Sequence, residues 1–574
     1  MNGQPAPARH FRGAARRRSP PTGPADLVLL NARVLTMDPA RPEAEAVAIA
    51  GDQILAIGTG AEVQRLSVSS TVAHDLRGRC VLPGFHDSHN HMLATAHSRT
   101  LVDLSAARTI DAVLRKLSQR AESTPPGHWV LSSGRWHETQ LVEKRFPRRE
   151  ELDAALPSHP VMIQRGGHNI VVNSRAFQLA GIPEDVPNPA GGTYVRDPNT
   201  GRLTGHVIDA AMRPLRARVP QPTRAELGAA LRAMQAQYNA AGLTSVLEPG
   251  LEPREMAAFR ALREGDAPSV RVTMMWRLQP GFDDASLQSS LDAIASGAVS
   301  IQGDDPWLRT TSIKLGMDGG VEAGFYRDPY AHPDDPAHPR GLPLTSPENF
   351  RAVCTAAAQQ GWQVGTHCVG DAAIDLVLDG YEAANQVASI NGLRWTLIHM
   401  MYAREDHWQR ANRVGLVVTA QQPLQYTLAD GFRHYIGPER ARDIEPLRMY
   451  LDRSAQPVGG GSDSPVTPFQ PLLGIWSSVT RATDRAGVQG PEWAISADEA
   501  LRMYTLGSAW CAFEEETKGS LSPGKFADVV VLDRDPRAVE PDAIRELNVD
   551  RTYVGGQLVF DREGAAIRRT GGVR

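Results

Sequence analysis

Residues 81–93 read Val-Leu-Pro-Gly-Phe-His-Asp-Ser-His-Asn-His-Met-Leu, a short apolar run that ends in a His-x-His pair. Side chains two residues apart leave the same face of an extended strand, so His89 and His91 are predicted to point together. A neutral imidazole nitrogen is a good ligand for zinc and related cations. The stretch therefore predicts a strand that carries half of a metal site, although such pairs also occur on solvated strands.

Four further polar residues follow short β-like runs later in the chain. They are Lys314, His367, His399 and Asp463. Helix-like segments separate these runs, an alternation typical of a parallel sheet. In a (β/α)8 barrel every strand end opens onto one face, where active sites are built. We therefore predict the α/β class and a (β/α)8 TIM barrel that brings these side chains to one spot.

The predicted barrel elements alternate along the chain. The candidate strands are 81–91, 244–249, 269–278, 309–316, 363–368, 394–400, 415–421 and 456–462. The candidate helices are 225–240, 254–264, 346–360, 372–388, 403–413 and 496–508. A loop rich in Pro, Asp and His at 319–343 follows the fourth strand and is a candidate lid.

The remaining segments predict three parts around this barrel, which is expected to span 81–519. Residues 1–24, rich in Pro, Gly, Ala and Arg, are expected to be a disordered tail. Strand-like runs in 25–80 (26–37, 46–50 and 53–58) and in 520–574 (527–533 and 551–560) are each too few to form a stable layer, so together they predict a flanking composite β-sandwich. The gap after strand one exceeds a single helix and predicts an inserted subdomain at about 98–222, over the barrel mouth.

Composition narrows the class of protein. The 574 residues are 41% hydrophobic and 22% charged, with a formal net charge of −4, so nothing favours nucleic acid or an acidic membrane as partner. No apolar run approaches the length of a membrane span. Four cysteines without CxxC spacing fit a reducing cytoplasm. We expect a cytoplasmic enzyme that acts on a small-molecule substrate. The oligomeric state is left open, with a homodimer as one option.

The order His-x-His, Lys, His, His, Asp on strands one, four, five, six and eight resembles the amidohydrolase superfamily. Further matching segments are 168–182, 313–319, 367–371 and 461–465, and they resemble its YtcJ-like, amidohydrolase-3 branch, which includes N-substituted formamide deformylases. The similarity covers roughly residues 25–560. The chain departs from the branch at Ala372, where an Arg is usual, and at Met400 and Met401, which follow the strand-six histidine.

The resemblance implies a metal-dependent hydrolase fold and one or two divalent metal ions, most often Zn²⁺. It assigns the metal ligands to His89, His91, His367, His399 and Asp463, with Asp463 also the proton shuttle. Lys314 matches the position that is carboxylated in binuclear members. A bare ammonium would repel a cation, so Lys314 can be a ligand only in carboxylated or neutral form.

These residues predict hydrolysis of a C–N bond in an amide, an N-formyl compound or a cyclic amide, by water activated on the metal. Asp463 is the expected catalytic acid and base, and His399 is expected to help polarise the carbonyl. The alternatives are an amidine or heterocycle deaminase on the same fold, which Lys314 argues against, and a metal-free barrel that serves as a binding or scaffold protein.

Four residues are candidates for substrate binding. They are His168, Arg165, Asp318 and Gln421. For Arg165 and His168 the alternative is hydrogen bonding within the inserted subdomain. Asp318 could instead fix the loop after strand four, and Gln421 could belong to ordinary packing around the pocket.

Overall fold

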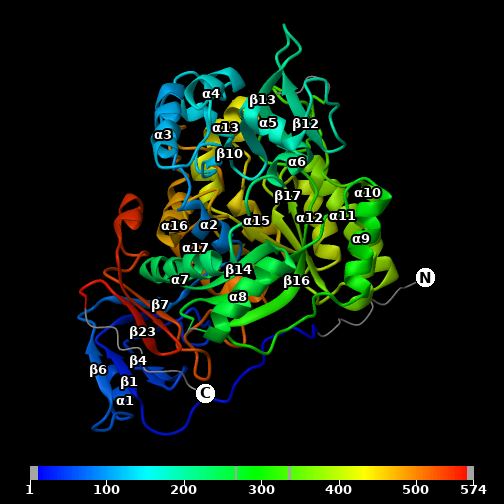
Figure 1. The fold of residues 1–574 in the computed structure, drawn as a ribbon. Coiled ribbons are helices and arrows are strands. Elements are labelled where there is room, and N and C mark those ends of the chain that lie inside the picture. Colours follow the sequence, from blue (N-terminus) through cyan, green and yellow to red (C-terminus); the bar gives the residue numbers. More distant parts are fainter. Residues whose placement is uncertain (1–10, 266–267, 334–337, 565–574) are drawn as a thin grey trace.

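The computed structural model describes residues 11–265, 268–333 and 338–564. Its centre is a sheet of eight parallel strands in the order predicted for a barrel (Figure 1). The strands are β8 (Phe85–Asp87), β14 (Leu243–Leu251), β15 (Arg271–Arg277), β16 (Leu308–Gly316), β17 (Gln363–Cys368), β18 (Thr396–His399), β19 (Val417–Ala420) and β20 (Gly459–Gly460). Between β20 and β8 the backbone N–H of Ser88 donates to the carbonyl of Gly460 at 2.9 Å. The sheet is thus nearly closed, and the TIM-barrel prediction is confirmed.

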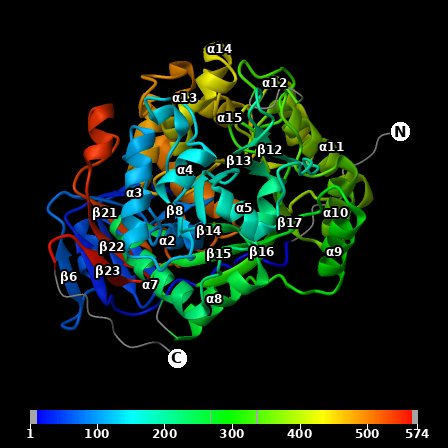
Figure 2. The ribbon, with the colours of Figure 1, turned by 45° about the horizontal axis from the view of Figure 1, so that its top comes forward.

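Helices cover the outside of this sheet (Figure 2). Those linking consecutive strands are α7 (Arg224–Ala240), α8 (Pro253–Gly265), α9 (Asp284–Ala295), α10 (Pro347–Gln360), α11 (Asp371–Val387), α12 (Glu405–Arg413), α13 (Pro423–Tyr435), α14 (Pro438–Ala441) and α15 (Leu447–Arg453). Helix α16 (Pro471–Thr480) is the first helix after the last strand. Local sequence signals determine where some of these helices begin. Thr223 and Glu226 form a capping box at the start of α7. The segment predicted as one helix at 496–508 is α17 (Ala497–Arg502), a π-helical turn at Met503–Gly507 and α18 (Ser508–Cys511).

Helix α9 was not predicted, because its sequence has little apolar periodicity. Only Ser290 and Ile294 are buried along its length. Its start is set by Asp283, whose side chain accepts from the backbone N–H of Ser286. A single cap and a narrow buried face leave a weak signal in the sequence.

Strands from both ends of the chain form two small sheets, drawn blue and red in Figure 1. The four-stranded sheet runs β5-β4-β1-β6 and the six-stranded one β23-β22-β21-β7-β2-β3. Their strands are β1 (Leu27–Leu30), β2 (Arg33–Leu35), β3 (Glu43–Ala44), β4 (Ala46–Ala50), β5 (Gln53–Gly58), β6 (Val72–Asp75), β7 (Cys80–Pro83), β21 (Val529–Leu532), β22 (Val549–Val554) and β23 (Gln557–Asp561). Buried Leu29, Ile49, Val81 and Val531 pack together between them. Neither end of the chain supplies this core alone.

Two expected strands are each divided between sheets. The run 26–37 turns at Asn31, which has a φ of 54°, so β1 and β2 pair in different sheets. The run 81–91 turns at Gly84, where β7 of the small sheet gives way to β8 of the barrel. A Cβ on Gly84 would lie 2.2 Å from Thr244 Cγ2, closer than any side chain tolerates. Glycine lets the chain pass tightly from one core to the other.

The segment after strand one forms a separate layer at the top of Figure 1. It begins after α2 (Met92–Ser98) and contains a five-stranded sheet in the order β12-β13-β11-β10-β9. Its elements are α3 (Ile110–Glu122), β9 (Val130–Leu131), α4 (Arg149–Ala155), β10 (Val161–Arg165), β11 (Asn169–Val172), α5 (Ser174–Ala180), β12 (Gly192–Arg196), β13 (Leu203–Asp209) and α6 (Arg213–Arg216). Two hydrophobic clusters of its own support this layer.

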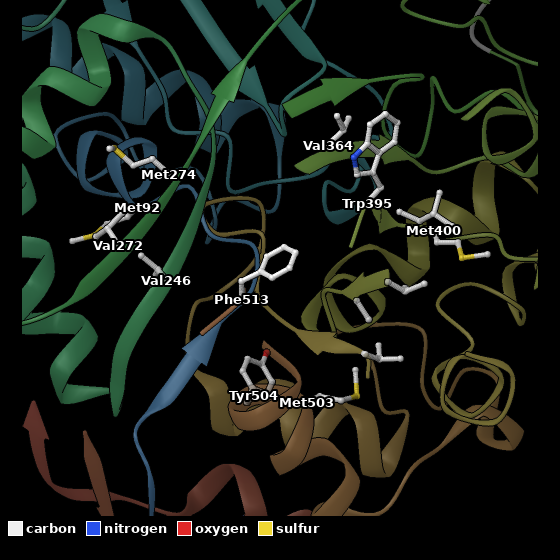
Figure 3. Close-up of a cluster of buried hydrophobic side chains, with 14 of the residues drawn as sticks. Met92, Val246, Val272, Met274, Val364, Trp395, Met400, Met503, Tyr504 and Phe513 are labelled. Carbon is white, nitrogen blue, oxygen red and sulfur yellow. The ribbon is translucent and has the colours of Figure 1, made fainter. Parts of the chain in front are cut away.

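The main core surrounds the barrel sheet. Figure 3 draws part of it, including Val246 of β14, Val272 of β15, Val364 of β17 and Trp395 just before β18. The indole N–H of Trp395 donates to the carbonyl of Trp362 at 2.8 Å, so this buried polar atom is satisfied. No helix in the described part of the chain is long and apolar enough to cross a bilayer.

The N-terminal segment departs from the expected tail where the structure describes it. Residues 1–10 lie outside the described residues. The ring of Phe11 is buried and stacks on Phe513 with centroids 4.2 Å apart. Arg18 pairs with Asp52 at 2.6 Å. Residues 11–18 therefore contact the barrel and the small sheets, because an apolar ring and a guanidinium group find partners there.

Candidate active site

The His-x-His pair does not lie in an extended strand, which corrects the predicted single strand at 81–91. His89 and His91 follow the end of β8, and His91 is the N-cap of α2. Their rings nevertheless lie edge to face, with centroids 5.2 Å apart. A turn at the strand end, and not strand alternation, brings the two imidazoles together.

Five histidines form a continuous row of rings above the strand ends. The centroid distances are 5.2 Å from His91 to His89, 5.0 Å from His89 to His399, 4.7 Å from His399 to His367 and 5.3 Å from His367 to His168. The first four come from strands one, five and six. His168 comes from the inserted layer, which reaches down to the barrel at this point.

Asp463 lies against the first two rings of the row. Its Oδ1 is 3.3 Å from Nε2 of His89 and 3.3 Å from Nε2 of His91. Its backbone N–H donates to the carbonyl of His89 at 2.8 Å. Asp463 and His399 both have positive φ, 58° and 68°. Such conformations cost about 1–3 kcal/mol and persist at sites that the surrounding fold holds rigidly.

These side chains are suited to hold a divalent cation. One ligand atom each from His89, His399 and Asp463 lies within 4.8 Å of the other two. The Nδ1 of His89 is buried without a hydrogen-bond partner in the described ranges. Burial, opposed by the Asp463 charge, lowers the pKa of His399 to about 4, and burial and the Lys314 charge hold the pKa of His89 well below its usual range. The imidazoles are thus neutral at pH 7, as metal ligation requires.

Lys314 lies two residues before the end of the fourth strand and lines the same cavity. Burial lowers the pKa of its ammonium to about 7, against the opposing charge of Asp463. A substantial fraction of this amine is therefore neutral near pH 7. Only a neutral amine can bond to carbon dioxide, so the environment suits carboxylation of this lysine.

Asp87 is a positioning residue that the sequence did not single out. Its buried carboxylate accepts from the backbone N–H groups of His89 at 3.1 Å and Ser462 at 3.0 Å. It also accepts from the Ser462 hydroxyl at 2.6 Å and from Nδ2 of Asn90 at 2.8 Å. One carboxylate thus joins the ends of strands one and eight, which carry the two histidines and Asp463. Its place inside the quoted motif was the available signal.

Gln421 is not among the residues that line the cavity, and its role in substrate binding stays a prediction. It is fully buried at the end of β19. Its side-chain carbonyl accepts a hydrogen bond from Nδ1 of His399. The contact that the structure shows for Gln421 is thus with His399, whose ring it orients.

Asp318 lies beside the row and binds mainly backbone. Its carboxylate accepts from the N–H groups of Phe325 at 2.8 Å, Val369 at 2.9 Å and Gly370 at 2.9 Å. Oδ1 is 3.8 Å from Nε2 of His367. Burial raises its pKa to about 7 despite these N–H donors. These contacts favour the alternative reading, in which Asp318 fixes the loop after strand four.

Arg165 and His168 both line the cavity, with different partners. Arg165 is buried between two carboxylates, 2.9 Å from Glu138 and 2.5 Å from Glu322. His168 Nδ1 lies 2.7 Å from Oδ1 of Asp209, and although burial opposes it, this carboxylate raises the pKa of His168. The charge of Arg165 is thus balanced by carboxylates of the protein, whereas the ring of His168 lies next to that of His367.

A single cavity of about 740 Å³ contains this site. The metal-ligand candidates His89, His91, Lys314, His367, His399 and Asp463 all line it. The inserted layer supplies the opposite wall through Trp136, Arg165, His168 and Arg216. All six predicted ligands thus meet in one place. Sequence reasoning missed Arg216 and Asp209, since nothing in the inserted segment indicates which residues face the barrel. It also missed Glu322, in the loop after β16.

The sequence matches the model of the Amidohydrolase family over residues 73–560. The chain belongs to that family. It is 30% identical to the N-substituted formamide deformylase of Arthrobacter pascens, covering 94% of this chain and 99% of the relative. It is 27% identical to the putative amidohydrolase YtcJ of Bacillus subtilis (strain 168), covering 85% and 90%.

A solved structure shares the fold of this amidohydrolase. It is that of an uncharacterized metal-dependent hydrolase from Pyrococcus horikoshii OT3, with a TM-score of 0.69 and 22% identity, covering 90% of this chain and 99% of that one. Membership of the family makes the protein a hydrolase of carbon–nitrogen bonds.

Proposed function

We propose that this amidohydrolase uses one or two divalent metal ions, with zinc the first candidate, to hydrolyse an amide or N-formyl C–N bond. The ligands are His89, His91, His367, His399 and Asp463. The observation that carries the proposal is the meeting of neutral imidazoles and a carboxylate within 4.8 Å. Nitrogen and carboxylate donors in this combination suit zinc and its neighbours.

A cation bound there would supply a water nucleophile at neutral pH and would polarise the substrate carbonyl. The protein supplies the proton transfers. The Asp463 carboxylate, which lies 3.3 Å from the Nε2 atoms of His89 and His91, takes a proton from the attacking water and returns it to the departing nitrogen. His399, held by Gln421, presents Nε2 toward the cavity.

Lys314 extends the proposal to a second cation. Carboxylation would turn its amine into an anionic oxygen donor, and a pKa of about 7 leaves neutral amine available for that reaction. Carbon-13 NMR of protein kept in ¹³C-bicarbonate should show a carbamate signal that disappears in Lys314→Ala. Equal spectra for both proteins would exclude the modification.

Cleavage of N-substituted formamides comes first in the search for a substrate, because a relative 30% identical over nearly its full length carries that activity in its name. The deciding experiment measures bound metal in purified protein by elemental analysis, together with release of formate from N-benzylformamide. We expect one or two equivalents of metal per chain, loss of turnover after chelation and recovery when zinc is restored. Turnover that survives complete metal removal would end the proposal.

A further inference from the structure

Five arginines that line the cavity (Arg108, Arg135, Arg213, Arg216 and Arg277) form no ion pair within the described ranges, and two of these, Arg216 and Arg277, interact with each other. Arg277 is the last residue of β15, and Arg216 is the last residue of α6 in the inserted layer. Both line the cavity that holds the histidine row. Within the described ranges, neither forms an ion pair, and Arg216 donates only to the carbonyl of Gly167, at 3.1 Å. The two remaining arginines of the wall differ, because Arg165 and Arg485 each contact two carboxylates.

The positive charges of these two guanidinium groups repel each other. Both side chains are exposed along the cavity, and partial desolvation there, followed by the like charge of Arg277, lowers the pKa of Arg216. Asp209, whose charge acts on Arg216, is hydrogen-bonded to His168 at 2.7 Å. Glu248 is the carboxyl group that interacts with Arg277, and burial raises its pKa well above the usual value. Like charges placed together without a counter-ion are unfavourable, and an anion bound between them would remove that cost.

The backbone makes room for Arg277 beside the candidate metal site. Gly250, at the end of β14, has a φ of 76°, and a Cβ there would lie 3.3 Å from Nε and Nη2 of Arg277. The same Cβ would lie 3.6 Å from Cγ of Lys314. Arg277 also pairs with Lys314 in the β15–β16 ladder. Arg277 therefore lies on the strand next to that of a predicted ligand, and it lines the same cavity as the histidines.

The far wall of the cavity is apolar. In a barrel of eight strands, β19 lies across from β15, four positions on in the sheet order. Lining residues that follow β18, β19 and β20 include Met401, Leu424, Leu428 and Val466. The charged residues on that side, Asp484 and Arg485, pair with each other at 2.9 Å. The cavity thus has a cationic side and an apolar side with the histidine row between them.

We infer that Arg277 and Arg216 bind a carboxylate of the substrate, so that the enzyme acts on N-acyl or N-formyl amino acids with an apolar group. The inference rests on the proposed hydrolase function. Hydrolysis would join the water oxygen to the carbonyl carbon, break the C–N bond and leave the proton on nitrogen, giving a carboxylic acid and an amino acid. Guanidinium groups suit this role because they bind carboxylates through paired N–H donors.

The test compares N-formyl-phenylalanine with its neutral amide, N-formyl-phenylalaninamide, which keeps the shape and loses the charge. We expect kcat/KM to favour the acid by roughly tenfold or more, the value of a charged hydrogen bond. Arg277→Gln and Arg216→Gln should bring the ratio close to one, mainly through KM. Arg218→Gln, an exposed arginine two residues from Arg216 that does not line the cavity, should keep the ratio.

Calorimetric titration with 3-phenylpropanoate and with 3-phenylpropanamide gives a second readout that needs no turnover. The carboxylate should bind more tightly to the wild type and to Arg218→Gln than to the other two variants, whose folding is checked by circular dichroism. Equal treatment of acid and amide, in turnover or in binding, overturns the subsite and leaves the hydrolase function intact. Arginine-dependent binding of the carboxylate without hydrolysis of either compound supports the subsite and refutes the proposed hydrolysis.

Discussion

The side-chain carbonyl of Gln421 accepts a hydrogen bond from Nδ1 of His399, and this contact decides which imidazole nitrogen faces the cavity. The amide of Gln421 cannot turn around freely, because its Nε2 donates to the carbonyl of Thr419 at 2.9 Å. The proton of His399 is therefore held on Nδ1, and the lone pair of Nε2 is left for a ligand role. The buried amide of Gln421 thus determines which ring nitrogen of His399 is available as a ligand.

Replacing Gln421 with Leu should weaken metal binding by about 10–100-fold, since the imidazole loses the partner that orients it. Competition with a chelator measures the affinity directly. Gln421→Glu keeps an acceptor oxygen at the same place and should retain most of it. An unchanged affinity in the Leu variant would show that His399 is not oriented through Gln421.

Asp463→Asn should reduce kcat by about 10²–10⁴-fold, the usual contribution of a general acid and base. Asparagine tolerates the positive φ at this position, so the backbone should be kept. Bound metal, measured by elemental analysis, should remain, because the histidine ligands are untouched. Full turnover of N-benzylformamide in this variant would remove Asp463 from the mechanism.

Arg165→Met should destabilise the protein strongly, by about 3–5 kcal/mol, because it leaves Glu138 and Glu322 buried without their cation. Glu138 belongs to the inserted layer and Glu322 to the loop after β16, so the variant should also loosen the contact between them. Thermal unfolding and hydrogen exchange in both segments measure the effect. Arg175→Met, on the exposed side of α5, is the control. Equal unfolding temperatures for the two variants would contradict this account.

Asp375→Asn should loosen the loop after β16, because Arg327 of that loop contacts Asp375 at 2.7 Å. Proteolysis within 319–333 should accelerate, while Asp379→Asn, which removes a more exposed ion pair on the same helix, should have little effect.

The Asp375 contact should also depend on pH. Although partial burial opposes it, hydrogen bonds from His407 and Arg327 hold the pKa of Asp375 well below its unfolded value of 3.8. A carboxylate whose pKa is lower in the folded than in the unfolded protein stabilises the fold at pH values above its unfolded-state pKa. This stabilisation is lost as the pH falls toward the folded-state pKa. The gap in unfolding temperature between wild type and Asp375→Asn should thus be full at pH 6–7 and should shrink below about pH 4. A gap that widens in acid would reverse this sign.

Much of the barrel could be predicted because its signals are local. The runs 309–316 and 363–368 lie within one residue of β16 and β17 at each end. Apolar runs followed by a helix cap are read from a few neighbouring residues. The divided strands at Asn31 and Gly84 could not be read in this way, since each division depends on which of two cores the next residue enters.

The sequence by itself determined the kinds of ligand and their places at strand ends, because residue type and strand order survive without coordinates. Only the tertiary structure decided which side chains act on the cavity and which act on each other. Arg165 pairs with Glu322, which lies 157 positions further along the chain, whereas Arg277 and Arg216 line the cavity and form no ion pair within the described ranges. Such pairing is a matter of a few ångströms between distant segments, and that distance is set by packing.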